Sequence, residues 1–514
     1  MNQSRMGLAW PTRGERLVAW MLVVAAAGVL LIWVFISLVH IDDRERVGHG
    51  QGAWMALARY ANEGVLYPPL FDGEHYGGTR WMPLGIVAHA FAARLSGSEL
   101  VGGKMLALLT ALALLALALA ALRWLRSPWP LAAALLAAVL ASEAGLFTTT
   151  TIGADILAVA VQVGALVAFL GRAEEAAAGL GGSGERRTRA LIAAGVLAGF
   201  ALLAKLTAGW AALAILCRLG ATGRWRDFGV FLAAASAPAL AGIGAGLVAS
   251  EGRMWDSVAQ LAFAGGAGPV SLVRAPNQVV YNFVEYAPGF LAVLPFAVAA
   301  IALVGRWREL SVVDWALAWA LVALLAVFTD VGTGLNQLLD VVVLTALVAA
   351  QLPGRLSALV GEPGQRLGQH ALAVAALTAL SAGVVMTLVP AARSTVEVTR
   401  HGHPLPTVPL AEVIRPDDTV LSEDPYVPVA HERHPVVLDP FMLRRLDEVD
   451  PATVDPLIER IEQGAFDHVV LLEDLDEPEW WEVYHFGPRV ADALRQGYEP
   501  SGVRDGYLLY RPAR

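Results

Sequence analysis

Cysteine, lysine and charged residues are scarce in this chain of 514 residues. The single cysteine, Cys217, excludes an intrachain disulfide and leaves the redox compartment open. Only 16% of the residues are charged while 56% are hydrophobic, which excludes an ordinary soluble globular protein. The formal net charge is −9, so there is no basic excess of the kind that a nucleic-acid partner requires.

Apolar runs of about 20 residues, the length that a helix needs to cross the hydrocarbon core, recur through the first three quarters of the chain. They predict an all-α polytopic membrane domain over 1–399. The first run is too long for the core of a signal peptide and lacks a small-residue cleavage site, so we expect it to remain as an anchor. About eleven transmembrane helices are predicted, at 17–39, 100–122, 129–147, 153–171, 189–204, 206–219, 228–249, 281–304, 312–329, 335–351 and 370–390.

Arginines occupy every second connection between these runs, which is the positive-inside pattern. They are Arg5, Arg13, Arg16, Arg123, Arg126, Arg172, Arg186, Arg187, Arg189, Arg218, Arg224, Arg226, Arg306, Arg308, Arg355 and Arg366. The pattern predicts a multi-pass plasma-membrane protein with a cytoplasmic N-terminus. The outer face would then hold the loop 40–99, the turns near 148–152, 205 and 330–335, the loop 250–280 and everything after about 391.

Two further segments follow from the same pattern. A full span at 82–95 would put Arg123 and Arg126 outside, so this apolar stretch is predicted to be an interfacial or re-entrant helix. The connection 172–189 is rich in Gly and charge and is predicted to be a flexible cytoplasmic linker.

The composition changes near residue 400 to that of a small soluble domain. Short apolar runs at 419–422, 435–438, 468–474 and 507–512 alternate with helical stretches at 451–463 and 488–496. This alternation predicts an extracytoplasmic α/β domain over 400–514.

The first loop contains the longest polar interruption of the membrane part, at 40–83, and we expect the chemistry there because long loops in compact domains usually carry function. Asp42 and Asp43 follow the first helix directly. A carboxylate partly desolvated at the membrane surface could have a raised pKa and act as a general base. Asp72 and Glu74, in a Gly-rich stretch that can fold over a site, are the other two candidates.

Positive groups in the same loop suit a phosphate. Arg59, Arg80 and His75 can donate hydrogen bonds to phosphate oxygens. No HExxH motif is present and the histidines have no converging helical spacing, so no tightly bound transition metal and no cofactor are expected. A loosely held divalent cation stays compatible with the carboxylates.

Four polar residues interrupt the apolar runs near their predicted outer ends. Charged groups within the membrane are costly and so tend to be functional. Asp155 begins a helix, and Lys205, the only lysine besides Lys104, lies at the tip of an apolar hairpin. Asn336 and Asp340 are four residues apart and should share one helix face. An interfacial helix start would also explain Asp155, and snorkelling to lipid head groups would also explain Lys205.

These features resemble the GT-C superfamily of integral-membrane glycosyltransferases, which includes protein O-mannosyltransferases and lipid A aminoarabinose transferases. The resemblance rests on one helix followed by a long acidic loop, on ALARYANEGVLYPPL at 56–70, on YGGTRWMPLGIVAHAFAARLSG at 76–97, and on GTGLNQLLD at 332–340. Asp155, the Lys205 hairpin and the external tail add to it.

The resemblance implies transfer of a sugar from a polyprenyl-phosphate carrier to an acceptor on the outer face, with inversion. A loop aspartate would deprotonate the acceptor hydroxyl, Lys205 or an arginine would hold the leaving phosphate, and Tyr76 would belong to the donor site. Many relatives carry an acid pair where this chain has Gly50, Gln51 and Gly52.

Two other classes of function, a transporter and a membrane anchor, predict different sequence patterns. A transporter or flippase for a lipid-linked sugar or other amphiphile would have polar residues near the bilayer midplane and broken helices arranged as a repeat. The central stretches are instead rich in Ala and Leu, and no internal repeat is evident. A membrane anchor for the C-terminal domain would not need eleven spans.

Overall fold

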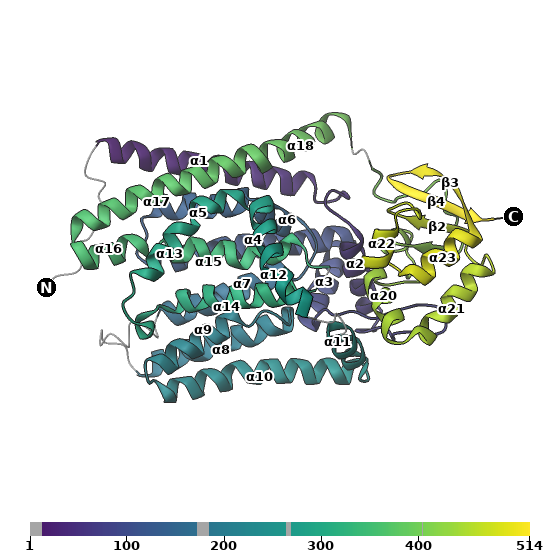
Figure 1. Cartoon of the computed structure of the whole chain (residues 1–514), viewed down its shortest axis with the longest axis horizontal. Helices are drawn as coiled ribbons and strands as arrows, with labels where there is room; N and C mark the ends of the chain where they lie inside the picture. Colours follow the sequence, from purple (N-terminus) through teal and green to yellow (C-terminus); the bar gives the residue numbers. More distant parts are fainter. Residues whose placement is uncertain (1–12, 172–183, 264–268, 331, 403–404, 514) are drawn as a thin grey trace.

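The computed structural model describes residues 13–171, 184–263, 269–330, 332–402 and 405–513 (Figure 1). A long helical bundle carries a small α/β domain at the end opposite the N-terminus. The helical elements of the bundle are α1 (Arg13–Val39), α2 (His49–Asn62), α3 (Pro83–Ser96), α4 (Glu99–Trp124), α5 (Trp129–Ala141), α6 (Glu143–Thr150), α7 (Asp155–Phe169), α8 (Gly184–Ala204), α9 (Trp210–Ala221), α10 (Trp225–Ala249), α11 (Arg253–Phe263), α12 (Pro269–Tyr286), η2 (Pro288–Ala292), α13 (Leu294–Ala302), η3 (Trp307–Glu309), α14 (Val312–Val327), η4 (Leu335–Leu338), α15 (Leu339–Ala349), α16 (Leu352–Val360), α17 (Glu362–Gly383), η5 (Val384–Leu388) and α18 (Val389–His401).

The prediction of a mostly helical membrane domain is confirmed. Among the described residues, six helices are long and apolar enough to cross a membrane, or up to eight if each bent pair counts as one span. The bent pairs are α5 with α6, at 75°, and the segment 270–302, at 104°. Three shorter apolar helices, α7, α9 and α14, complete the set that coincides with the predicted ranges. The count of eleven spans stays a prediction.

The arginine-rich connections meet at one end of the bundle. Arg218 donates a 2.9 Å hydrogen bond to the carbonyl oxygen of Arg308, and His370 lies 3.2 Å from Glu15 of α1. Arg187 pairs with Asp227 at the same end. The α/β domain caps the other end (Figure 1). The bundle therefore has one basic end and one end that faces the α/β domain.

Two predicted connections differ from the structure. The predicted loop 250–280 contains α11 and most of α12, whose apolar residues recur with helical rather than random spacing. The predicted linker 172–189 lies outside the described residues up to 183, and 184–189 already belong to α8. The apolar stretch 82–95 is helical, as α3, with Pro83 at its first turn where a missing N–H costs nothing.

The C-terminal part builds a four-stranded mixed sheet, which confirms a small α/β unit. Its elements are β1 (Val420–Ser422), α19 (Tyr426–Ala430), α20 (Pro440–Val449), α21 (Pro451–Glu462), β2 (His468–Leu471), α22 (Pro478–Val483), α23 (Pro488–Gly497), β3 (Tyr498–Arg504) and β4 (Tyr507–Pro512). The strand order is β1-β2-β4-β3, with β1 parallel to β2 and the other pairs antiparallel.

One predicted run takes another form. Residues 435–438 make an isolated bridge, in which Val437 pairs with Tyr76 of the first loop. The backbone N–H of Tyr76 donates to Val436 O at 2.7 Å, and Leu438 N–H donates to Tyr76 O at 2.8 Å. The first loop thus supplies backbone and an aromatic side chain to the core of the α/β unit.

Helix α2 approaches the α/β unit closely at Gly52. A Cβ atom there would lie 2.5 Å from Asp424 Oδ1 and from the backbone N of Tyr426. Only glycine allows this approach. Gly52 is therefore a point of close contact between α2 and the start of α19.

Candidate functional site

Lys205 lies in the short connection between α8 and α9, within a cluster of polar side chains. Its Nζ is 2.6 Å from Asp155 Oδ1 and 2.5 Å from Gln337 Oε1. The Asn336 amide donates to Asp155 Oδ2 at 2.8 Å. The structure thus brings together Lys205, Asp155 and Asn336, which the sequence places in three separate segments.

Asp340 belongs to the same cluster. Its Oδ1 accepts a 2.6 Å hydrogen bond from the indole N–H of Trp210, at the start of α9. Asn336 lies in the 3₁₀ turn η4 and Asp340 in α15, so the predicted single helix face is a turn followed by a helix. Gln337 and Trp210 were not predicted from the sequence. Gln337 could have been identified because it is a polar residue directly after Asn336.

The charges of this cluster do not cancel. One ammonium, that of Lys205, faces two carboxylates, those of Asp155 and Asp340. Both side chains of the Lys205–Asp155 pair are about one-fifth exposed, at 19% and 21%. An anion that binds Lys205 must therefore share the ammonium with Asp155, and a hydroxyl or other donor could bind the carboxylates.

Asp43 differs from its predicted role. The carboxyl is buried, contacts His40 Nδ1, and lies 3.3 Å from Lys104 Nζ. Burial raises the pKa of Asp43, but the hydrogen bond with His40 and the charge of Lys104 outweigh it and lower the pKa to about 2. The expectation of a raised pKa at this position is wrong, because the contact between the loop and Lys104 of α4 depends on long-range packing that the sequence does not reveal.

The Lys104 ammonium also ties down the loop backbone. It donates to the carbonyl oxygens of His40, Asp43 and Glu45 at 2.6, 2.7 and 3.1 Å. Asp42, the neighbour of Asp43, points outward and is exposed. Thr151, just before α7, donates to Arg46 O at 2.9 Å, so the start of the loop lies beside the connection that leads to Asp155.

Asp72, Glu74 and His75 form an exposed turn against the α/β unit. Asp72 Oδ1 accepts from the backbone N–H groups of Glu74 and His75 at 2.9 and 2.7 Å, and His75 Nδ1 is 3.4 Å from Asp72 Oδ2. Burial raises the pKa of Asp72, but these hydrogen bonds and the nearby His75 together outweigh it and lower the pKa. The turn therefore stabilises its own ionised carboxylate.

Tyr76 and Arg59 hold the two parts of the molecule together. Tyr76 is 1% exposed and its hydroxyl accepts from Leu457 N–H of α21 at 3.1 Å. Arg59 donates to Glu432 O at 2.9 Å and lies 3.4 Å from Glu63. Both positions differ from the predicted contact with a donor phosphate, because the α/β unit folds back onto the first loop, which its sequence alone does not reveal.

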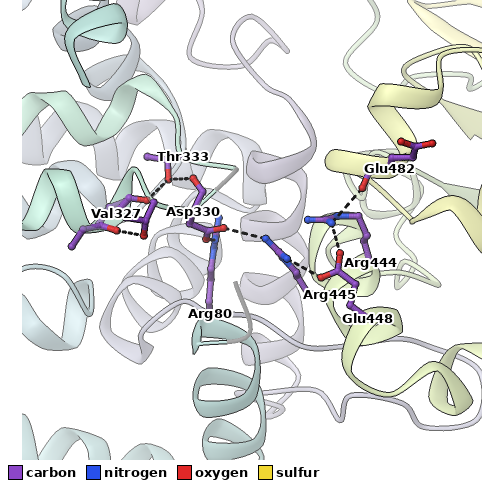
Figure 2. A network of polar contacts seen from close by, with 10 residues as sticks. Arg80, Val327, Asp330, Thr333, Arg444, Arg445, Glu448 and Glu482 are labelled. Carbon is purple, nitrogen blue, oxygen red and sulfur yellow. Dashed lines mark hydrogen bonds and ion pairs between the residues drawn. The ribbon is translucent and has the colours of Figure 1, made fainter. Parts of the chain in front are cut away.

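Arg80 does point into a cluster of charges (Figure 2). It donates to Asp330 Oδ2 at 2.7 Å, and Arg445 of α20 is 3.4 Å from the other oxygen of the same carboxylate. Arg444 and Arg445 share Glu448. The α20 arginines were not predicted, because charged residues in a soluble domain are common and carry no special signal.

The α/β unit also contains a buried acid, Glu423. Glu423 accepts hydrogen bonds from His485 Nδ1 at 2.5 Å, Trp480 Nε1 at 2.7 Å and Leu472 N–H at 2.6 Å. Burial raises the pKa of Glu423 to about 7, and burial lowers the pKa of His485 to about 3. The ring of His49, at the start of α2, lies 4.0 Å from that of His485.

Metal ligands are not grouped in the part of the chain that the structure describes, where no three His, Cys, Asp or Glu side chains converge. The candidate site therefore consists of ion pairs and hydrogen-bond donors. They lie between the bundle and the α/β unit and along the connection 329–340.

Comparisons with known proteins give structural matches. No family model matches the sequence, and neither does any of the curated proteins compared with it. The structure is similar to that of ArnT from Cupriavidus metallidurans in the apo state, with a TM-score of 0.57, 14% identity, and coverage of 96% of this chain and 97% of the other. With ArnT bound to undecaprenyl phosphate the TM-score is 0.59 at 13% identity and the same coverage.

A second match is the oligosaccharyltransferase of Archaeoglobus fulgidus in the apo form. Its TM-score is 0.52 at 12% identity, and the match covers 93% of this chain and 74% of the other. The likeness extends over nearly the full length of this chain in each case, so it includes both the bundle and the C-terminal unit. The chain therefore has the fold of the GT-C membrane glycosyltransferases.

Proposed function

We propose that the protein is an inverting membrane glycosyltransferase that takes a sugar from a polyprenyl-phosphate-linked donor and transfers it to an acceptor on the outer face of the plasma membrane. The observation that carries this proposal is the near full-length likeness to ArnT, one of whose structures holds undecaprenyl phosphate. The polar cluster around Lys205 supports it, because an ammonium and hydrogen-bond donors at one end of the bundle suit a lipid phosphate.

In the proposed reaction the acceptor oxygen forms a bond to the anomeric carbon while the bond from that carbon to the phosphate oxygen breaks. The acceptor proton passes to a carboxylate, and the electron pair of the broken bond stays on the phosphate. Lys205 would stabilise that charge, since a fixed cation where negative charge develops lowers the barrier. In the resting state Asp155 and Gln337 hold the ammonium in place.

Of the four candidate carboxylates in the loop, Asp42 is the one we propose as the base. Asp43 is buried and ion-paired, and Asp72 accepts two backbone hydrogen bonds, so both are poor proton acceptors. Glu74 belongs to the same exposed turn as Asp72, and its carbonyl accepts from Arg460 of the α/β unit at 2.7 Å. Asp42 is exposed and directly follows α1, in the loop whose Arg46 carbonyl accepts a hydrogen bond from Thr151 just before α7.

The test uses purified protein in lipid nanodiscs with a panel of polyprenyl-phospho-sugars. Release of polyprenyl phosphate that depends on an added acceptor is the expected result. Reconstitution in proteoliposomes covers the alternative: movement of an intact lipid-linked sugar across the bilayer, with no release of polyprenyl phosphate from any donor, would contradict transfer and favour a flippase.

Orientation is tested by labelling. In a Cys217→Ser background, we expect Gly50→Cys and Val503→Cys to react with a membrane-impermeant maleimide in intact cells. Gly305→Cys, in an arginine-rich connection at the basic end of the bundle, is the matched control and should react only after permeabilisation. The reverse pattern would overturn the outward placement of the α/β unit.

A further inference from the structure

Three guanidinium groups surround one aromatic ring where α20 meets the bundle. The guanidinium carbons of Arg80, Arg444 and Arg445 lie 5.0, 5.2 and 5.4 Å from the centre of the Phe441 ring. Arg80 comes from the first loop, whereas the other two come from the α/β unit. Three like charges this close repel each other unless anions compensate them.

The compensation by protein groups is incomplete. Two carboxylates, those of Asp330 and Glu448, face the three arginines (Figure 2). Asp330 joins Arg80 to Arg445, and Glu448 joins Arg445 to Arg444. Among the described residues, these ion pairs set two carboxylates against three guanidinium groups. A buried excess charge is unfavourable, and a bound anion would remove that cost.

Arg444 has the geometry to bind such an anion. Its side chain is 6% exposed, and Nη1 donates hydrogen bonds to Glu448 and to Glu482 O. The buried Nε and Nη2 atoms have no hydrogen-bond partner among the described residues, and neither does Nε of Arg445. Nε and Nη2 form one edge of the guanidinium plane, which matches two oxygens of a phosphate or carboxylate.

The connection between α14 and α15 links these arginines to the Lys205 cluster. Asp330 begins the connection between α14 and α15, and Asn336 and Gln337 of the same connection contact Asp155 and Lys205. Gly332 in between packs on Phe441, since a Cβ atom there would lie 3.0 Å from the ring. The connection thus contacts both groups of side chains.

We infer that Arg444, together with Arg445 and Arg80, forms a binding site for a phosphate-type oxyanion of a substrate. The α/β unit contributes two of these three arginines. The identification of the ligand as a substrate rests on the proposed function, whereas binding of the oxyanion does not. The phosphate could belong to the lipid donor or to a phosphorylated acceptor.

The experiment measures equilibrium binding without turnover, using the full chain in nanodiscs. One arm titrates undecaprenyl phosphate and the other titrates glycerol 3-phosphate. Arg444→Gln should weaken binding on the order of tenfold or more, since the hydrogen bonds lost are charge-assisted. Arg444→Lys should lie in between, because it keeps the charge and loses the planar edge. Arg511→Gln, an exposed arginine of β4, is the matched control.

Asp330→Asn separates ligand binding from a merely structural role. It removes one negative charge next to Arg80 and Arg445, so it should tighten binding of the oxyanion, a gain that misfolding cannot produce. If Arg444→Gln weakens the binding of undecaprenyl phosphate alone, the site is assigned to the donor. If it weakens the binding of glycerol 3-phosphate, the site is assigned to an acceptor.

The inference is overturned if neither ligand binds, or if both bind with affinities that Arg444→Gln and Asp330→Asn leave unchanged. Failure of the proposed function looks different. In that case the arginine-dependent binding persists while no donor in the panel releases polyprenyl phosphate.

Discussion

The Lys205 ammonium lies 2.6 Å from Asp155 Oδ1, and the Asn336 amide donates to Oδ2 of the same carboxylate. Asp155 therefore joins the α8–α9 connection to the α14–α15 connection. The ion pair of Lys205 with Asp155 has two possible roles: it orients the lysine for a phosphate, or it stabilises the bundle. The two roles predict different behaviour in a double-mutant comparison.

The first prediction separates these roles. Lys205→Ala and Asp155→Asn should each lower the melting temperature, and the double variant should recover part of the loss, since an ion pair is then removed as a whole. The partial recovery is expected because the Asp155 carboxylate is no longer left without its ammonium, although the Asp340 carboxylate remains. We expect the apparent affinity for undecaprenyl phosphate to stay roughly tenfold weaker in the double variant, since the ammonium is still missing. Arg400→Ala, an exposed cation, is the control. Recovery of affinity together with stability would favour a structural pair.

The second prediction concerns the two neighbouring aspartates. Asp42→Asn should lower kcat for sugar transfer by roughly a hundredfold or more, the usual contribution of a general base, while the melting temperature stays unchanged. Asp43→Asn should instead lower the melting temperature, because it leaves the buried Lys104 ammonium without its counter-charge. Full activity of Asp42→Asn would move the base to Asp72 or Glu74.

The third prediction tests the contact between α2 and α19. Gly52→Ala should destabilise the protein by about 1–3 kcal/mol, because the added methyl group meets backbone that cannot easily shift. Gly50→Ala lies in the same helix with open space around it, so it should be neutral or slightly stabilising. Thermal melts and limited proteolysis of the two variants give the comparison. Equal melting temperatures would contradict the close packing of α19 on α2.

The fourth prediction is a pH dependence of stability. The pKa of His485 is lowered from 6.5 to about 3 in the folded protein, so its contribution to stability is present above pH 6.5 and is lost as the pH falls toward 3. Its neighbour His49, with a pKa lowered to about 4 by burial, acts in the same direction. Glu423 acts oppositely: its contribution is present below pH 4.5 and is lost as the pH rises through about 7.

His485→Gln should therefore flatten the acid side of the stability curve by up to one proton, about 1.4 kcal/mol per pH unit. Melting temperatures between pH 5 and 7 measure the slope. His401→Gln, at the exposed end of α18, is the control and should run parallel to the wild type. A parallel curve for His485→Gln as well would show that its ring takes up its proton as freely in the folded protein as in the unfolded one.

The sequence predicts the bundle well because each apolar run, such as 100–122, has no other stable environment than a helix in lipid or core. Asp155, Lys205 and Asn336 were identifiable for the same reason, since polar groups stand out against Ala and Leu. Arg444 and Glu423 were not, because charges are ordinary in a soluble domain. The ion pair of Asp43 with Lys104 depends on long-range packing. Strand β3 also depends on it, because the segment around Pro500 and Gly502 has no apolar run that would predict a strand.

The last helix of the bundle is longer than the hydrocarbon core of a bilayer is thick. From Glu362 to His401 it runs for 40 residues through the π turn η5, so it is about 60 Å long. The hydrocarbon core of a bilayer is only about 30 Å thick. The part of this helix beyond the membrane acts as a stalk, with Thr395 bonded to His40 at the end of α1. Under the proposed function, the length of this helix would set the distance between the lipid phosphate and the α/β unit, which follows the helix in the chain.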